Sequence, residues 1–362
     1  MKNYNSCKKL FLLICPVLCF LNSCYILQQA GPFLSQRFKA RKIEEVLKDP
    51  ATEEKTRLFL ERVLDIKEYA STVLGLKKDK NYTTYIEVKE DYVATVVSAC
   101  QPFSFEAWLW DYPVVGKLPY KGFYKEKDAR QEVEKLKKKG LDVWVRRVSA
   151  FSSLGYFSDP LYSYMQSYTA YDLANLIIHE QTHATIFLKN QSQFNEELAS
   201  FVGDTGARLY VAARFGSHSP EYLAIDRDQQ EAETYRQFIL ELRKKLEILY
   251  NTPGMEPEKR QQEKQQIIEK AKADFKADYD KLFTTDNYKG FSDLPVNNAY
   301  ISLFSLYNQD LSLYGKLYEK EGQSIPAMIR RLKAYKGKAP VKEAMEEWVQ
   351  PADIPAESTP GK

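Results

Sequence analysis

Residues 169–188 read TAYDLANLIIHEQTHATIFL and have the pattern of one capped helix. Thr169 is a favourable N-cap residue, and Asp172 stands at the third helical position, from which it can reach back as in a capping box. His179 and His183 lie four residues apart inside this helix. Residues at that spacing share one face of an α-helix. The stretch therefore predicts a helix from Ala170 to about Leu188 with two adjacent imidazoles.

The pentapeptide from His179 to His183 has the form HExxH, which is typical of zinc hydrolases. Two imidazoles on one helix face can bind one metal ion, and Glu180 can reach a water molecule beside it. The chain has only three histidines, and two of them fall in this pattern. We expect one zinc ion per chain, with Glu180 as a general base rather than a ligand. The alternative is a pair of core histidines that are satisfied by hydrogen bonds.

A third protein ligand is needed, because catalytic zinc takes three and leaves a fourth position to water. The metzincin continuation is absent, since Lys189 stands where its last histidine would be. A second helix is predicted over about 195–214, and its start, Asn195-Glu196-Glu197, resembles the Asn-Glu element that supplies a glutamate ligand in gluzincins. This resemblance implies that Glu196 is the third ligand. Glu197 and Asp204 are the alternatives if the helix register differs, and Glu196 itself could merely be an acid at a helix N-terminus.

The group that would stabilise an oxyanion during hydrolysis is less well defined by the sequence. A Tyr or His from another segment usually has this role. His218 and Tyr307 are candidates for it, and Asn298 is a further candidate for a contact with oxyanion or substrate. With 25 tyrosines in the chain, a given tyrosine is more often a packing residue. Asn297 and Asn298 could instead cap the helix that follows them.

The remaining pattern predicts an α+β fold with a small N-terminal sheet region and a mostly helical zinc-binding core. Residues 24–168 form the α+β part, with helices up to about residue 76, two strands within 82–99, and a charged helix followed by a strand at 141–148. Residues 169–340 are mostly helical and include a charged helical hairpin at 225–283. We expect one domain over 24–340 and a mobile proline-containing tail at 341–362.

The first 23 residues have the order of an export signal. Lysines precede an apolar stretch at 10–21, which is too short for a membrane span of about 20 residues. Its end, Leu21-Asn22-Ser23-Cys24, resembles the lipobox of bacterial lipoproteins. We expect Cys24 to be lipidated and to anchor the protein to a membrane of the bacterial cell envelope, outside the cytoplasm. A plain secretory signal or a buried N-terminal helix is the alternative.

Charge and cysteine content limit the function classes. The chain has 52 basic and 49 acidic side chains, and three of the lysines lie in the export signal. The remaining body is neutral, which argues against nucleic acid as a partner. Of five cysteines, only Cys100 would remain outside the signal and the lipid site, so no intrachain disulfide is expected. Cys100 stands in an apolar run and is predicted to be buried.

Several further motifs occur together with the helix of His179 and His183. They are YKGFY at 120–124, GLDV at 140–143, SAFSSLGYFSDPL at 149–161, FNE at 194–196 and LPVNNA at 294–299. In this order they resemble a bacterial family of predicted aminopeptidases, and the FNE motif resembles the Asn-Glu element of gluzincins. The resemblance implies a lipid-anchored zinc peptidase that acts on peptides, with His179, His183 and Glu196 as ligands and Glu180 as catalytic acid and base.

Some features depart from this pattern and keep other functions open. The Gly-x-Met-Glu-Asn motif that holds the substrate amine in well-known gluzincin aminopeptidases does not precede the zinc helix. Two other interpretations therefore remain. One is a metal-binding lipoprotein without activity that uses the hairpin at 225–283 to bind a partner, and the other is a zinc amidase for cell-wall peptides.

Overall fold

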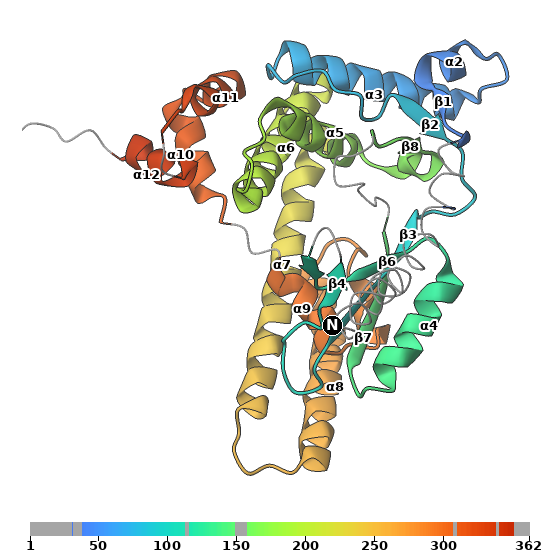
Figure 1. The fold of residues 1–362 in the computed structure, drawn as a ribbon, viewed down its shortest axis with the longest axis vertical. Coiled ribbons are helices and arrows are strands. Elements are labelled where there is room, and N and C mark those ends of the chain that lie inside the picture. The colour runs from blue at the N-terminus through green and yellow to red at the C-terminus, as the bar shows by residue number, and fades with distance from the viewer. Residues whose placement is uncertain are drawn as a thin grey trace, which may run out of the picture. The chain divides into compact units, whose positions relative to one another are not determined.

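The computed structural model describes residues 31, 38–112, 116–148, 158–306, 310–337 and 340–350 (Figure 1). The predicted export signal and Cys24 lie outside these residues. The chain forms two compact units, each built from three separate segments. Unit 1 contains the residues up to 42, 84–165 and 226–308, and unit 2 contains 43–83, 166–225 and 309–362. These units differ from the two consecutive parts expected from the sequence.

Unit 1 contains the sheets. The central one has the order β6-β3-β7, with β3 (Ala94–Cys100) between β6 (Lys121–Phe123) and β7 (Asp142–Val148), all antiparallel. The other strands are β1 (Arg41–Lys42), β2 (Thr84–Ile86) and β8 (Leu161–Tyr162) in a second sheet, and β4 (Trp110–Tyr112) with β5 (Gly116–Leu118) in a third. The two strands expected within 82–99 are therefore present, but they belong to different sheets.

Helix α4 (Glu126–Lys137) packs on the central sheet of unit 1. It joins β7 through Gly140, whose φ of +74° favours glycine. This agrees with the charged helix and the strand expected there. A small core including Val97, Phe123 and Leu136 lies between helix and sheet. Cys100 is buried in β3 as expected, and burial raises the pKa of its thiol.

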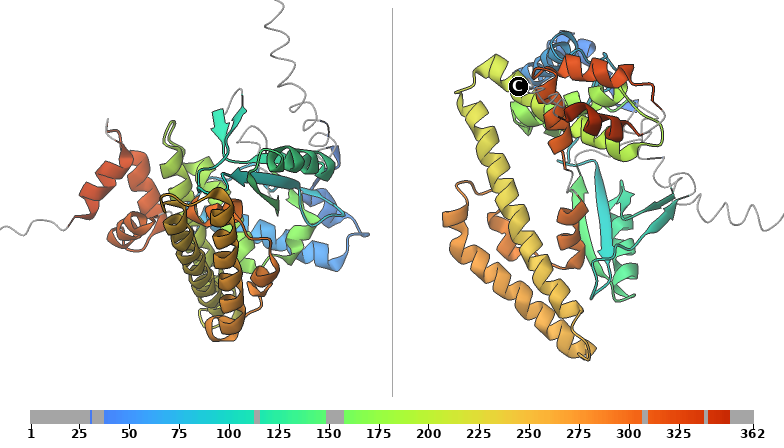
Figure 2. Two further views of the ribbon diagram at one scale, coloured as in Figure 1. Left: turned by 90° about the horizontal axis from the view of Figure 1, so that it is seen from below. Right: turned by 90° about the vertical axis from the view of Figure 1, so that its left-hand side faces the viewer.

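The predicted helical hairpin is present as α7 (Pro220–Tyr250) and α8 (Pro257–Leu282), which run side by side (Figure 2). Helix α7 begins in unit 2 and continues into unit 1. The inner face of the hairpin is apolar and aromatic. Tyr235 and Ile239 of α7 and Phe275 of α8 pack there together with the 3-10 helix η2 (Lys289–Asp293) and helix α9 (Asn298–Leu306). The hairpin thus has a buried inner face and a charged outer one.

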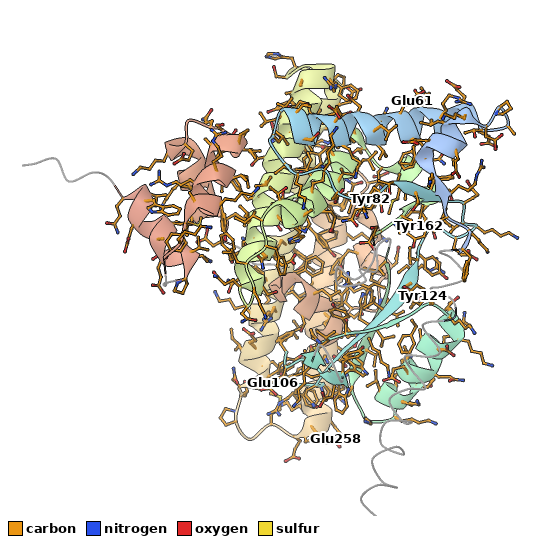
Figure 3. All side chains as sticks on the ribbon, turned by 45° about the horizontal axis from the view of Figure 1, so that its top comes forward. Glu61, Tyr82, Glu106, Tyr124, Tyr162 and Glu258 are labelled. Carbon is orange, nitrogen blue, oxygen red and sulfur yellow. The ribbon has the colours of Figure 1, made fainter. Side chains whose placement is uncertain are left out.

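Unit 2 consists of helices. Helix α2 (Ile43–Lys48) and helix α3 (Glu54–Thr72) form its first segment. The 3-10 helix η1 (Ser163–Ser167) begins in unit 1 and leads to α5 (Ala170–Thr185) and α6 (Ser192–Phe215) of unit 2. Leu60, Val63 and Ile66 recur at helical spacing and bury one face of α3, while Glu61 lies on the exposed face (Figure 3). None of the helices in the described part of the chain is long and apolar enough to span a bilayer.

The C-terminal part of unit 2 forms three further helices, α10 (Ser312–Lys320), α11 (Ile325–Ala334) and α12 (Val341–Val349). The expected mobile tail from residue 341 is therefore wrong over α12. The helix forms because Val341, Ala344 and Met345 are buried on one side of it, at helical spacing. Residues 351–362 lie outside the described residues.

Candidate metal centre

The sequence correctly predicted the start of α5. Thr169 is its N-cap, and its hydroxyl accepts a hydrogen bond from the Asp172 backbone N–H at 3.0 Å and donates one to the Asp172 carboxylate at 2.7 Å. The helix ends at Thr185, three residues earlier than expected, because Ile186 adopts an extended conformation. Helix α6 begins at Ser192 and returns beside α5 (Figure 1).

Two glycines allow α6 to lie close to α5. A Cβ atom at Gly203 would lie 3.0 Å from the Asn175 side chain and 3.3 Å from the His179 Cβ atom. A Cβ atom at Gly206 would lie 3.0 Å from Ile178 and only 2.8 Å from Leu74 of the segment after α3. Both helices therefore pack through their backbones at this point, and the antiparallel course brings the first turn of α6 to the two histidines.

Three potential metal ligands meet between α5 and α6. The Nε2 atoms of His179 and His183 are 3.2 Å apart, and the Glu196 carboxylate oxygens lie 3.7 Å from His179 Nε2 and 3.6 Å from His183 Nε2. Ligand atoms bound tetrahedrally to one zinc ion at 2.0–2.1 Å would be about 3.3 Å apart. The triad of two imidazoles and one carboxylate therefore fits zinc in both its donor set and its spacing.

Burial and neighbouring groups shift the pKa values of His183 and Glu196 toward the protonation states that metal binding requires. Burial lowers the pKa of His183, and the neighbouring His179 lowers it further. The His179 ring beside Glu196 lowers the pKa of that carboxyl group, although partial burial opposes this effect. A metal ion binds neutral imidazole and ionised carboxylate. His183 Nε2 is the nitrogen available to a metal, because it is the ring atom that faces His179 and Glu196.

Asn195 holds the first turn of α6 against the end of α5. Its side chain accepts a hydrogen bond from the Leu188 backbone N–H and donates one to the Leu188 carbonyl, each 2.8 Å long. The residue is almost fully buried. Sequence reasoning missed this role, although an asparagine near a helix N-terminus often bonds to nearby backbone. The adjacent Glu196 is thereby held at the histidines, with 52% of its side chain exposed.

The structure also separates Glu196 from the two alternatives considered for the third ligand. Glu197 is buried and faces the opposite way, where it binds Lys342 of α12, Tyr314 of α10 and Gln193. Asp204 lies further along α6, where it accepts a hydrogen bond from Tyr171 and pairs with Arg208. Glu196 is the acidic residue that lies with both histidines.

The other residues singled out from the sequence lie elsewhere or remain untested. Glu180 follows His179 on α5 and is partly exposed, and its role as a base stays a prediction. His218 is not at the site: it lies beyond Phe215 at the far end of α6, which is about 28 Å along the helix from Glu196. Tyr307 lies outside the described residues.

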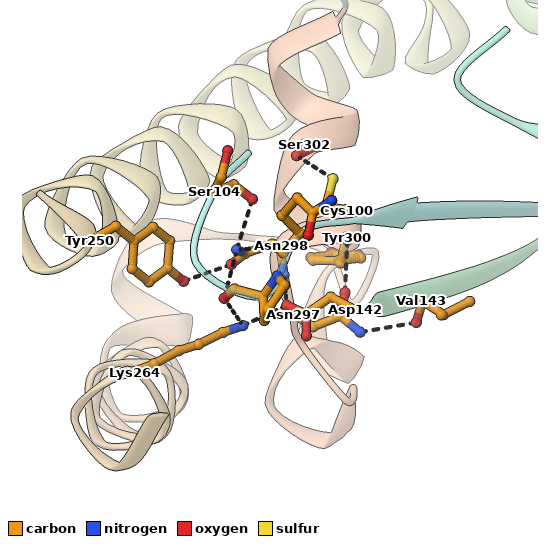
Figure 4. Close-up of polar contacts among 12 residues, drawn as sticks. Cys100, Ser104, Asp142, Val143, Tyr250, Lys264, Asn297, Asn298, Tyr300 and Ser302 are labelled. Atoms are coloured by element: carbon orange, nitrogen blue, oxygen red, sulfur yellow. Dashed lines mark hydrogen bonds and ion pairs between the residues drawn. The ribbon is translucent and has the colours of Figure 1, made fainter. Parts of the chain in front are cut away.

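Asn298 lies in a buried polar network of unit 1 (Figure 4). Its side chain accepts a hydrogen bond from the Tyr250 hydroxyl at 2.7 Å and donates to backbone carbonyls of the loop after β3. Asp142 accepts from the Asn298 backbone N–H at 2.9 Å and also pairs with Lys264. Asn297 caps α9 by accepting from the Tyr300 N–H. The motifs at 140–143 and 294–299 thus meet in one network, and Asn298 has no exposed surface there.

His179, His183 and Glu196 define a candidate metal centre between α5 and α6 within an α+β fold. The sequence matches the family described as "Putative aminopeptidase" over residues 24–346, and the chain therefore belongs to this family. The family description indicates peptidase activity. Comparison with curated proteins and with solved structures found no match.

Proposed function

We propose that the protein is a zinc-dependent peptidase, and in particular an aminopeptidase, as the family description indicates. The observation that carries the proposal is the triad of His179, His183 and Glu196, whose ligand atoms lie within 4.8 Å of one another. The HExxH pattern adds a carboxylate, Glu180, at the position next to the first histidine.

The residues of α5 and α6 would have different roles in the reaction, namely metal binding and proton transfer. Zinc, when bound, lowers the pKa of a water molecule and polarises the scissile carbonyl. Glu180 accepts the proton that this water loses and passes it to the nitrogen of the leaving amine. His179, His183 and Glu196 hold the ion, and Glu196 also contributes the negative charge of the ligand set.

The proposal includes the cellular location predicted from the first 24 residues. Cys24 would carry lipid and anchor the protein to a membrane of the bacterial cell envelope. Membrane fractions of cells that express the full chain should contain the protein, and Cys24→Ala should release it or leave it uncleaved. The intact mass of the mature protein would show whether a lipid is attached.

The decisive experiment measures zinc per chain by elemental mass spectrometry on the chain from Tyr25 onward. About one zinc is expected, with loss in His183→Ala and Glu196→Ala. His218→Ala is the matched control, because it removes the remaining histidine far from the triad. Absence of zinc, or zinc that is indifferent to the two ligand variants, would reject the metal centre.

A second variant separates catalysis from metal binding. Glu180→Gln should retain zinc and lose cleavage of a peptide library. If the native chain and the Glu180→Gln variant both bind zinc but neither cleaves any peptide, the interpretation as a metal-binding protein without activity would be supported instead. Cleavage of muropeptides but not of linear peptides would support the zinc amidase.

A further inference from the structure

Phe187 is an exposed aromatic side chain beside the candidate metal centre. It lies between α5 and α6, and 66% of it is accessible, which is the largest value among the large apolar side chains described in unit 2. Its ring centroid is 6.3 Å from that of His183, and the two rings meet edge to face at 68°. A single exposed apolar residue is common on protein surfaces, so its significance depends on how firmly it is held.

The backbone on both sides of Phe187 is fixed. Before it, the N–H of Ile186 donates to the Thr182 carbonyl at 2.9 Å, and the Ile186 side chain is buried. After it, both backbone groups of Leu188 are bonded to Asn195. Phe187 therefore stands between two anchored residues, and its ring is held toward solvent next to His183.

We propose that Phe187 contacts the substrate and selects peptides with a large apolar or aromatic residue next to the scissile bond. This inference rests on the proposed function. In a peptide whose scissile carbonyl lies at the triad, the Cα atoms of the two residues that flank this bond are about 4 Å apart. The side chains of both residues therefore start close to the triad. A side chain at that position can pack against a ring that itself contacts His183, and apolar contacts of this kind set enzyme specificity.

The test compares peptides that differ only in the residue next to the scissile bond. Zinc-loaded full chain in detergent is assayed with Phe-Ala-Ala and Ala-Phe-Ala, each against Ala-Ala-Ala. Phe187→Ala should lower kcat/KM for one of the phenylalanine peptides about tenfold, mainly through KM, and change the alanine peptide less than about twofold. Phe187→Leu should restore part of the difference.

The matched control is Phe215→Ala, which removes a partly exposed phenylalanine at the other end of α6. It should leave all three peptides unchanged. Equal effects of Phe187→Ala on phenylalanine and alanine peptides, no effect on any peptide, or loss of zinc from this variant would overturn the inference.

A binding measurement keeps this inference separate from the proposed activity. Phenylalanine hydroxamate and alanine hydroxamate share the same α-amino and metal-binding groups and differ only in the aromatic ring. The zinc-loaded protein should bind the former more tightly, and Phe187→Ala should remove most of that preference. If the protein cleaves no peptide but shows this preference, the proposed catalysis fails while the apolar subsite stands; equal affinities for the two compounds reject the subsite.

Discussion

The side-chain amide of Asn195 is hydrogen-bonded to both backbone groups of Leu188, with each bond 2.8 Å long. The pair joins the first turn of α6 to the segment that leaves α5. Glu196 follows Asn195 directly, so the same pair determines where the carboxylate of Glu196 stands relative to His179 and His183.

Asn195→Ala should strongly lower the affinity for zinc and have a smaller effect on the stability of the metal-free protein. Loss of a partner that orients a ligand typically lowers metal affinity about 10–100-fold. Competition titration with a zinc chelator gives the affinity, and thermal unfolding of the metal-free protein gives the stability. Ser192→Ala, an exposed change in the same turn, should alter neither. An unchanged affinity in Asn195→Ala would show that Glu196 is positioned by other contacts.

Lys342→Met should destabilise the protein by about 2 kcal/mol, because it removes a charged hydrogen-bond donor from the buried Glu197 carboxylate. Tyr314 and Gln193 still bind Glu197 in this variant, which limits the loss. Urea unfolding provides the measurement. Glu197→Gln should lower the free energy of unfolding less in the Lys342→Met variant than in the native chain. Fully additive effects would argue that the two side chains are independent.

Glu231→Gln should alter the dependence of stability on pH. Burial alone would raise the pKa of Glu231, but hydrogen bonds from the side chains and backbones of Thr284 and Thr285 lower it below its usual value. The carboxylate therefore stabilises the folded chain above its unfolded pKa of about 4.3, and this contribution is lost as the pH falls through the lower folded pKa. The variant should be less stable at pH 7, and its difference from the native chain should shrink below about pH 4. A difference that stays constant with pH would contradict this.

Gly206→Ala should destabilise unit 2, because the added methyl group would clash with Leu74 and Ile178. Overpacking of this kind costs about 1–3 kcal/mol. Gly203→Ala should also weaken zinc binding, since its Cβ atom would press on His179. Gly315→Ala is the control: its nearest neighbour is 4.0 Å away, and alanine favours a helix by up to about 1 kcal/mol. Thermal unfolding and zinc titration distinguish the three variants.

The sequence predicted the elements and residues that depend on local pattern. Capping and helical spacing were enough to place Thr169 and the two histidines on one helix, whereas Glu196 was predicted from the resemblance of its Asn-Glu motif to a known ligand element. The pairing of the strands could not be predicted from the local sequence, because the strands within 82–99 pair with segments far along the chain rather than with each other. Helix α12 was missed because flanking prolines resemble a tail, whereas the burial of Met345 depends on helices formed elsewhere. The exposure of Phe187 depends on the hydrogen bonds between Leu188 and Asn195, which join the ends of two helices and do not follow from helical periodicity.

The ion pair of Glu197 and Lys342 also bears on the order in which the protein is made. A ribosome adds Glu197 145 residues before Lys342. During that interval the growing chain holds α5 and α6, but Lys342 is not yet present to pair with the Glu197 carboxylate. Helix α12 therefore completes the contacts of Glu197 after α5 and α6 have been made. A protein truncated ahead of α12 would keep the bonds from Tyr314 and Gln193 to Glu197 but would lack the cation that neutralises this carboxylate next to Glu196.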